Sequence, residues 1–223
     1  QKLDKSLLPN LSHMWPLITE RLQTYDPGNQ YAVNYMWGTT AYAYNKAAIE
    51  QRMPDAPVDS WDMIFKPEVL AKFADCGVQV IDSPEDLFQS ALNYLGLDPN
   101  SKEQADLDKA YALLKSIRPY IQKFNSSEYI NALANGDICL AVGYSGDLLQ
   151  ARDRATEANN GVEVVYVIPK EGALMWFDSM VIPVDAPHAR DAHAFINFMI
   201  RPDIHPTNSN YVFYANATLH SQS

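Results

Sequence analysis

The sequence has few cationic residues and no segment in which they gather. It contains 17 lysines and arginines against 27 aspartates and glutamates, which gives a net charge of −10. Proteins that bind nucleic acid or anionic membranes usually present clustered lysine and arginine. The composition therefore argues against both partners and makes cationic ligands the more natural ones.

Long apolar runs are absent as well. No run approaches the roughly 18 residues that a membrane-spanning helix needs. With 47% hydrophobic and 20% charged residues, the 223-residue chain can still bury a core, as one body or as two lobes. The chain starts at Gln1 without methionine or a signal-like segment, so we expect a processed or truncated form.

Motifs of common enzymes and cofactor sites are also missing. There is no G-x-S-x-G elbow, no H-E-x-x-H, no Walker lysine and no glycine-rich dinucleotide turn. His188 and His193 are five residues apart, which does not bring two metal ligands together on a helix. All five histidines are interpreted as solvated or structural, and we expect no enzyme, metal or cofactor site.

Only two cysteines occur, Cys76 and Cys139, separated by 63 positions. They lack the close C-x-x-C spacing of zinc and thioredoxin-type sites. From the residues alone, a structural disulfide and two buried thiols both remain open.

Segments with helical periodicity alternate with apolar, β-rich runs. This alternation favours an α/β architecture with a mostly parallel sheet, in which ligand sites lie beyond the carboxyl ends of strands. The pattern predicts helices over 67–75, 84–95, 102–124, 128–134, 148–158 and 189–200, and strands over 31–45, 78–82, 138–142, 162–168 and 175–184.

Glu85 is the first of three acidic residues near such strand ends. It follows Ser83 and Pro84, which read as the N-cap and first residue of a helix, while Asp86 reads as the far end of a capping box. A favourable interaction with the helix dipole is therefore an alternative to a functional role for Glu85.

Asp147 and Asp178 are the other two. Asp147 ends the segment GYSGD at 143–147, which directly follows a predicted strand and precedes a helix, so it could serve simply as an N-cap. Asp178 interrupts an otherwise apolar, strand-like run. Because burying a carboxylate without a partner is unfavourable, its position favours a functional role at least as strongly as a structural one.

Aromatic residues accompany these acids: Tyr144 precedes Asp147 by three positions, Trp176 precedes Asp178 by two, and Tyr214 lies near the end of the chain. A carboxylate binds an ammonium through charge-assisted hydrogen bonds, and an aromatic face attracts the same cation. The combination suits an alkyl amine. An ordinary core, a sugar site and a glycoside hydrolase that uses two of the carboxylates remain alternatives.

Ordered sequence blocks along essentially the whole chain carry a family resemblance. The chain resembles the periplasmic putrescine/spermidine-binding proteins of bacterial polyamine ABC transporters. The blocks are YMWGTT at 35–40, APVDSW at 56–61, NYLG at 93–96, ANGDIC at 134–139, IPKEG at 168–172 and VFYAN at 212–216.

The resemblance implies a two-lobed, type II-like α/β solute-binding fold. Family members are longer, so it implies a partial chain that lacks much of the amino-terminal lobe and the carboxyl-terminal end. The implied division is a first lobe of 1–32 and 159–209, a second lobe of 33–158 and 210–223, and hinge crossings near 31–36 and 158–162.

The resemblance also implies roles for individual residues. The family's amine-binding carboxylates match Glu85, Asp147 and Asp178, and its aromatic walls match Tyr144, Trp176 and Tyr214. Trp37 is assigned to the hinge or the cleft wall. Cys76 and Cys139 match the family's disulfide pair, which suits an oxidising periplasm.

The function implied is that of a monomeric periplasmic receptor without catalytic activity. It would bind putrescine, spermidine or both between its lobes, close by hinge bending and deliver the ligand to the membrane permease of an ABC transporter. A binder of another cationic or small organic solute on the same scaffold is the alternative.

Overall fold

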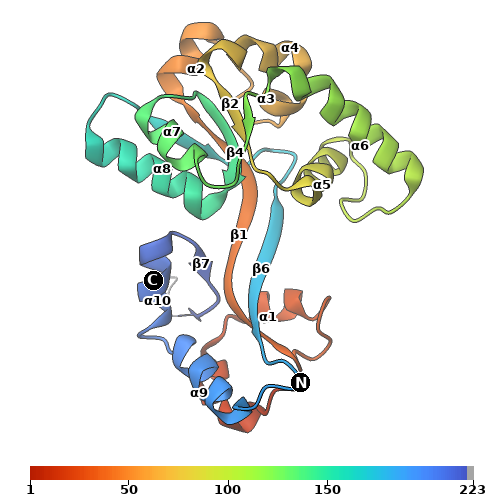
Figure 1. Cartoon of the computed structure of the whole chain (residues 1–223), viewed down its shortest axis with the longest axis vertical. Coiled ribbons are helices and arrows are strands. Elements are labelled where there is room, and N and C mark those ends of the chain that lie inside the picture. Colours follow the sequence, from red (N-terminus) through yellow and green to blue (C-terminus); the bar gives the residue numbers. More distant parts are fainter. Residues whose placement is uncertain (220–223) are drawn as a thin grey trace. The chain divides into compact units, whose positions relative to one another are not determined.

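The computed structural model describes residues 1–219, and these form two compact units (Figure 1). Unit 2 is the continuous segment Thr39–Leu174. Unit 1 combines Gln1–Gly38 with the described residues from Met175 onward. The chain therefore passes between the units twice, inside strand β1 (Ala32–Asn45) and inside strand β6 (Leu174–Val181).

The sheet of unit 2 has the strand order β3-β2-β4-β1-β5. Strand β2 pairs in parallel with β3 and β4, whereas β1 runs antiparallel to β4 and β5. The prediction of a mostly parallel sheet is therefore wrong for the central strand, because β1 continues directly from unit 1 and traverses the sheet in the opposite direction. The other strands are β2 (Val78–Val80), β3 (Lys123–Phe124), β4 (Leu140–Tyr144) and β5 (Val164–Val167).

This topology brings several strand ends to one edge of the sheet. The carboxyl ends of β2, β4 and β5 lie on the same side as the part of β1 that begins unit 2, since Thr40 pairs with Tyr144 and Tyr42 with Val167. Ligand sites of α/β proteins form at this kind of edge.

Local sequence signals explain several helix boundaries in unit 2. The Ser83 side chain accepts a hydrogen bond from the Asp86 N–H and Pro84 is the first helical residue, which confirms the predicted start of α5. Helix α7 ends at Gly136, whose φ of 81° is the left-handed conformation that favours glycine. The helices of unit 2 are α2 (Lys46–Arg52), α3 (Asp62–Phe65), α4 (Pro67–Leu70), α5 (Pro84–Tyr94), α6 (Gln104–Ile117), α7 (Tyr129–Asn135) and α8 (Ser145–Ala158), with 3₁₀ turns η3 (Ala71–Cys76) and η4 (Arg118–Tyr120).

Helix α6 is shorter than the predicted helix over 102–124. It ends at Ile117, a 3₁₀ turn follows, and Lys123–Phe124 forms strand β3 beside β2. Pro119 explains the difference, because proline lacks the backbone N–H that would continue the helical ladder.

A run of aromatic side chains packs in and against the unit 2 core. The rings of Tyr42, Trp61, Phe65 and Tyr94 follow one another with centroid separations of 5.6, 5.3 and 5.2 Å. In Figure 1, α7 and α8 lie on one side of this unit and α5 and α6 on the other. The core thus connects the sheet with α5 and α8, whose first turns carry Asp86 and Asp147.

The boundaries of the two units differ from the predicted lobes. The first crossing, after Gly38, lies just beyond the predicted 31–36, but the second lies at Leu174 and not near 158–162. Residues 159–174 stay with unit 2 because β5 pairs with β1 and the Glu171 carboxylate accepts a hydrogen bond from the Trp61 N–H at 3.0 Å. The described part of 210–223 belongs to unit 1, since β7 (Ala215–Asn216) pairs with β1 at Met36 and Trp37.

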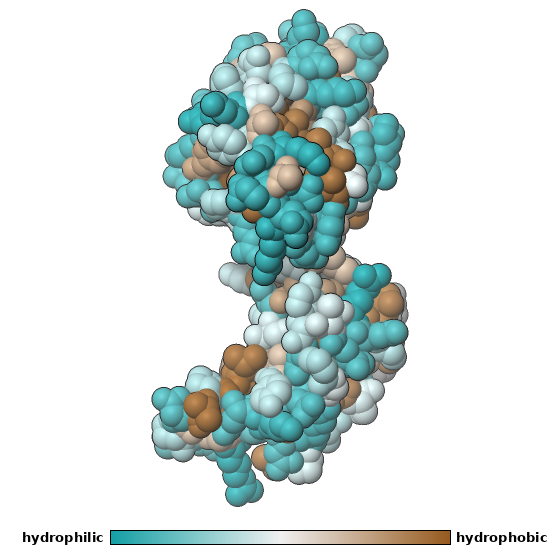
Figure 2. All heavy atoms as spheres, turned by 90° about the vertical axis from the view of Figure 1, so that its right-hand side faces the viewer, coloured by the Kyte–Doolittle hydropathy of each residue, from teal (hydrophilic) through white to brown (hydrophobic). Residues whose placement is uncertain are grey.

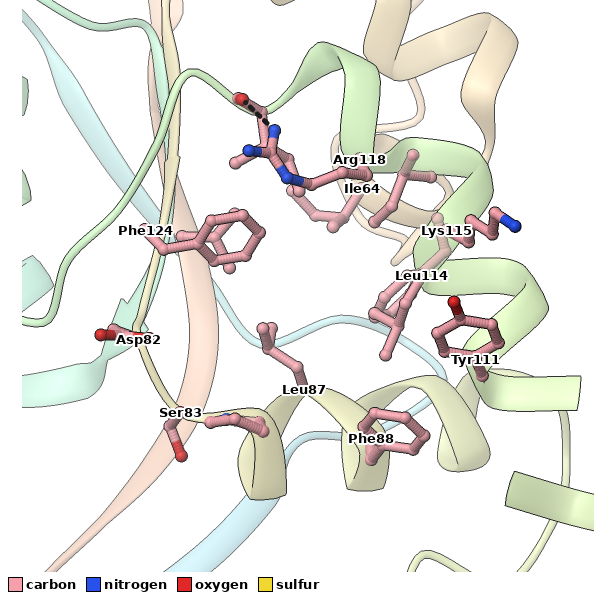
Figure 3. A pocket seen from close by; sticks show the side chains of 15 residues that line it. Ile64, Asp82, Ser83, Leu87, Phe88, Tyr111, Leu114, Lys115, Arg118 and Phe124 are labelled. Atoms are coloured by element: carbon pink, nitrogen blue, oxygen red, sulfur yellow. Dashed lines mark hydrogen bonds between the residues drawn. The ribbon is translucent and has the colours of Figure 1, made fainter. Parts of the chain in front are cut away.

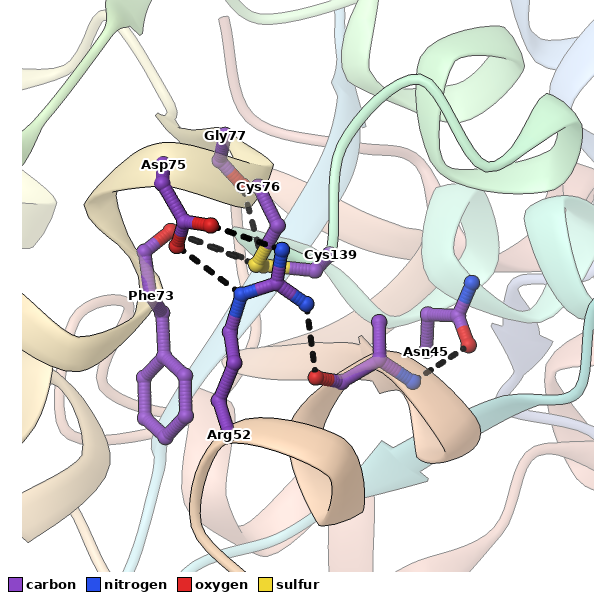
Figure 4. The surroundings of a disulfide bond; sticks show 8 residues. Asn45, Arg52, Phe73, Asp75, Cys76, Gly77 and Cys139 are labelled. Carbon is purple, nitrogen blue, oxygen red and sulfur yellow. Dashed lines mark hydrogen bonds and ion pairs between the residues drawn. A yellow bond between two sulfur atoms is a disulfide. The ribbon is translucent and has the colours of Figure 1, made fainter.

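The structure confirms the disulfide between Cys76 and Cys139 (Figure 4). The two Cα atoms are 5.5 Å apart, within the ordinary range for a disulfide. Cys139 is buried next to strand β4, while Cys76 ends the turn η3. Arg52 bonds both oxygens of Asp75 beside this turn, each at 2.8 Å, so η3 is joined to α2 as well as to the sheet.

Unit 1 has a smaller core built around Leu8, Ile18 and Ile200. Within residues 1–219, no helix of either unit is long and apolar enough to cross a membrane. The remaining elements are α1 (Pro16–Leu22), α9 (Ala189–Met199), α10 (His205–Val212) and the 3₁₀ turns η1 (Lys5–Leu7) and η2 (Pro9–His13).

His205 makes the stability of unit 1 dependent on pH. Its imidazole is fully buried, its Nε2 bonds the Tyr35 carbonyl oxygen, and burial lowers its pKa below the ordinary 6.5. The unfolded chain therefore binds a proton at pH values where the folded chain does not. We expect stability to be full above about pH 6.5 and to fall below it, by up to about 1.4 kcal/mol per pH unit for one proton.

Urea unfolding monitored between pH 7.5 and 5 checks this expectation. The His205→Gln variant should be less stable at pH 7.5 but should lose this part of the pH slope. An unchanged slope in the variant would assign the titration to another group.

Candidate functional site

Asp86 and Tyr144 meet at the sheet edge of unit 2. Tyr144, the last residue of β4, donates its phenol hydrogen to Asp86 Oδ2 at 3.1 Å. Thr40 donates its hydroxyl to the other oxygen, Oδ1, at 3.2 Å, and Ser83 donates to Oδ2 at 2.5 Å. Asp86 therefore lies where the ends of β2 and β4 meet the beginning of β1 in this unit.

The environment keeps the Tyr144 phenol protonated. Burial, and then the charge of Asp86 and the hydrogen bond to it, raise the pKa of Tyr144 to about 12. The phenol is thus a hydrogen-bond donor at neutral pH and the carboxylate its acceptor. The pair offers a negative charge beside an aromatic ring, both suited to an ammonium group.

Asp147 lies in the first turn of α8 and is hydrogen-bonded to Tyr129. The Tyr129 hydroxyl donates to Asp147 Oδ2 at 2.7 Å and accepts from the Tyr144 N–H at 3.2 Å. The Tyr129 side chain is fully buried. The alternative that Asp147 is merely an N-cap is wrong, because Tyr144 occupies the N-cap position and Asp147 is the third helical residue.

Gly143 gives the Tyr129 ring its space. A Cβ atom at Gly143 would lie 2.6 Å from two ring carbons of Tyr129, closer than real Cβ contacts come. Strand glycines often mark this kind of close approach. The glycine therefore lets the ring lie against β4 with its hydroxyl reaching Asp147.

Removing the Tyr129 hydroxyl tests this arrangement. In Tyr129→Phe, Asp147 loses a donor and the Tyr144 N–H loses its acceptor, so we expect stability to fall by about 1–3 kcal/mol. If Asp147 binds an ammonium, the affinity for that ligand falls as well.

Tyr42→Phe is the matched control. Tyr42 is also fully buried and donates its hydroxyl to the carbonyls of Val58 and Ser60, yet it contacts neither Asp86 nor Asp147 among its described hydrogen bonds. The Tyr42→Phe variant should lose stability but keep its affinity for the ammonium ligand. Equal losses of affinity in the two variants would assign Tyr129 a general structural role only.

In unit 1 the structure brings together Trp176 and Tyr214. Their ring centroids are 5.4 Å apart with the planes at 61°, an edge-to-face arrangement. Trp37 lies close to Tyr214 through strand pairing: it pairs with Ala215 and donates its indole N–H to the Asn216 carbonyl oxygen at 3.1 Å. The three predicted aromatic residues of this unit therefore lie on or next to β1, β6 and β7.

Asp178 and Glu85 are both exposed. The run around Asp178 was expected to be a buried strand, but Asp178 is exposed, because β6 is covered only partly. Its backbone carbonyl accepts a hydrogen bond from the buried Asn34 at 3.0 Å. Glu85 is exposed too, and the neighbouring Asp86 is the carboxylate of α5 that contacts Tyr144.

Three contributors were not identified from the sequence as parts of the site: Asp86, Thr40 and Tyr129. Asp86 was assigned only a capping role, although it lies only one position farther from the predicted strand than Glu85 does. Thr40 and Tyr129 reach the site through strand pairing and long-range packing, for which the sequence carries no local signal. Over residues 1–219, no cluster of three or more histidine, cysteine, aspartate or glutamate side chains could hold a metal ion.

Comparison with known proteins identifies relatives over nearly the whole chain. The model of the family described as bacterial extracellular solute-binding protein matches residues 2–222. The putrescine-binding periplasmic protein PotF of Escherichia coli is 48% identical over 219 residues, covering 97% of this chain and 59% of that protein. The spermidine/putrescine-binding periplasmic protein of Salmonella typhimurium is 34% identical and is covered over 54% of its length.

Solved structures agree with this relationship. A putative spermidine/putrescine ABC transporter from Listeria monocytogenes matches 99% of this chain with a TM-score of 0.81 at 32% identity, over 63% of that chain. The Tp0655 lipoprotein of Treponema pallidum matches 95% of it with a TM-score of 0.80 at 26% identity. These likenesses confirm the predicted α/β solute-binding fold, although the chain spans less than two thirds of these relatives' length. With a family match over residues 2–222, the chain belongs to the bacterial extracellular solute-binding proteins.

Proposed function

We propose that this chain forms the binding part of an extracytoplasmic receptor for polyamines. The observation that carries the proposal is the pair of carboxylates at one sheet edge, Asp86 and Asp147, each held by a tyrosine hydroxyl. Polyamines carry ammonium groups at neutral pH, and carboxylates with fixed orientation bind them by charge-assisted hydrogen bonds. The 48% identity to a putrescine-binding protein supports the same ligand class.

The two units contribute chemically different side chains to this proposal. Unit 2 supplies Asp86, Asp147 and Tyr144. Unit 1 supplies the edge-to-face pair of Trp176 and Tyr214, whose rings can cover the methylene groups of a polyamine and attract its charge. Glu85, Asp178 and Trp37 stay in the proposal as residues implied by the family resemblance.

The remaining features of the proposed function are those that the family resemblance implies. The receptor acts in the periplasm, as a monomer, without catalysis, and passes its ligand to the membrane permease of an ABC transporter. The names of the relatives support periplasmic solute binding and the polyamine class. In this role the carboxylates provide charge, not acid–base chemistry, which distinguishes it from a glycoside hydrolase.

Calorimetric titration of the protein tests the ligand class. Putrescine or spermidine should bind with a measurable, salt-sensitive affinity, whereas a panel of neutral sugars should give no heat. Binding of agmatine or another cation with no response to either polyamine would favour the alternative of a different cationic solute. Turnover of a chromogenic glycoside would contradict the proposal.

A further inference from the structure

An apolar pocket lies in unit 2 (Figure 3); neither Asp86 nor Asp147 lines it, although Ser83, which donates to Asp86, does. It encloses about 420 Å³ between α5, α6 and strand β3, within the size range of small-molecule sites. Leu87, Phe88, Leu114 and Phe124 contribute to its walls. Figure 2, which turns the side bearing α6 toward the viewer, shows hydrophobic side chains of this unit among hydrophilic ones.

Arg118 places a positive charge at the pocket. Its guanidinium lies over the Phe124 ring, 5.1 Å from the centroid, and its Nη1 donates to the Ile121 carbonyl oxygen at 3.1 Å. These two contacts hold the planar group in place, which reduces the entropy lost when it binds a carboxylate. Lys115 also belongs to the lining, but in Figure 3 its ammonium, 5.9 Å from the Tyr111 ring centroid, points away from the cavity.

Neither cation is neutralised within the described part of the chain. Arg118 and Lys115 form no ion pair there, although Lys109 on the same helix pairs with Asp106 at 3.2 Å. The one acidic residue of the lining, Asp82, directs its carboxylate away from the cavity in Figure 3. In a chain with a net charge of −10, this pocket therefore combines apolar walls with uncompensated positive charge.

We propose that this pocket binds an amphipathic organic anion, a carboxylate with an unbranched aliphatic tail of medium length. The tail lies against Leu87, Phe88 and Leu114, where burial of apolar surface drives binding. The carboxylate accepts hydrogen bonds from Arg118 in the fork geometry that guanidinium offers. The proposal does not depend on the polyamine function, because its ligand has the opposite charge and contacts different side chains.

Titration of the protein with sodium decanoate tests the proposal. We expect 1:1 binding with a Kd on the order of tens of micromolar for a ligand of this size. Decyltrimethylammonium, which has the same tail length and the opposite charge, should bind at least about fivefold more weakly. Equal affinity for the two ligands would show that Arg118 does not bind the carboxylate. An absence of decanoate binding would show that the pocket is not a site for this class of ligand.

Two variants and one control locate the site. Arg118→Gln should weaken decanoate about fivefold, the upper range for an exposed ion pair, and Leu114→Trp should block it by filling the cavity. Lys109→Gln removes a charge from the same helix outside the pocket and should leave decanoate affinity unchanged. Unaltered binding in Arg118→Gln contradicts the proposal even if Leu114→Trp fails to fold. Self-association through this face, detected by sedimentation together with an absence of decanoate binding, would contradict the proposal as well.

Discussion

Breaking the Cys76–Cys139 disulfide is expected to lower the free energy of unfolding by about 4 kcal/mol in the chain-entropy description of cross-links. The bridge joins residues 63 positions apart, so it closes a loop that contains β2, α5, α6, β3 and α7. Much of unit 2 is therefore restricted in the unfolded state by one bond. A change of this size is a large share of the stability of an ordinary domain.

Urea unfolding with and without reductant measures the effect. The wild-type protein should lose stability on reduction. The Cys76→Ala/Cys139→Ala double variant should have the same stability with and without reductant. The double variant also removes two sulfur atoms from the core, so the comparison within the wild-type protein isolates the bond itself. Identical midpoints for oxidised and reduced wild-type protein would show that the bridge does not stabilise the fold.

Neutralising either carboxylate of unit 2 is expected to weaken putrescine binding tenfold or more. Asp86→Asn and Asp147→Asn retain side-chain shape and an oxygen that can accept the tyrosine hydroxyl, but they remove the negative charge. Hydrogen bonds to charged groups contribute about 1.5–3 kcal/mol, which corresponds to roughly 10- to 150-fold in affinity. Calorimetry at constant salt concentration measures the loss.

Glu85→Gln is the comparison that decides between two neighbouring carboxylates. It changes the formal charge by the same amount as Asp86→Asn, one position away on the same helix. Because Asp86 contacts Tyr144 and Glu85 is exposed, we expect Asp86→Asn to produce the larger loss. A larger loss in Glu85→Gln would assign ammonium binding to Glu85, as the family resemblance implies. Unchanged binding in all three variants would show that none of these acids contacts the ligand.

Local signals explain what the sequence could predict. Ser83 and Pro84 define the start of α5 because capping involves only residues close together in the chain. The direction of β1 could not be predicted in the same way, because it depends on how the chain travels between two units. The sequence could not show which of Glu85 and Asp86 contacts Tyr144 for a related reason: adjacent helical residues point about 100° apart, so the packing of the whole helix decides which one reaches the sheet.

The structure brings together some of the residues predicted for the site. Tyr144 and Asp147 lie at one sheet edge, and the rings of Trp176 and Tyr214 contact each other. Tyr129 was missed because a buried tyrosine in a short helix looks like ordinary core in the sequence. Its role depends on the approach of two segments, α7 and β4, that only the folded chain reveals.

The close contact between Gly143 and Tyr129 couples two positions during evolution. Any side chain at position 143 would displace the tyrosine ring, so a mutation there becomes tolerable only after residue 129 has become smaller. That first step removes the hydroxyl that holds Asp147. Substitution at either position thus reduces control of the carboxylate, and a lineage that replaces both must orient Asp147 by another donor.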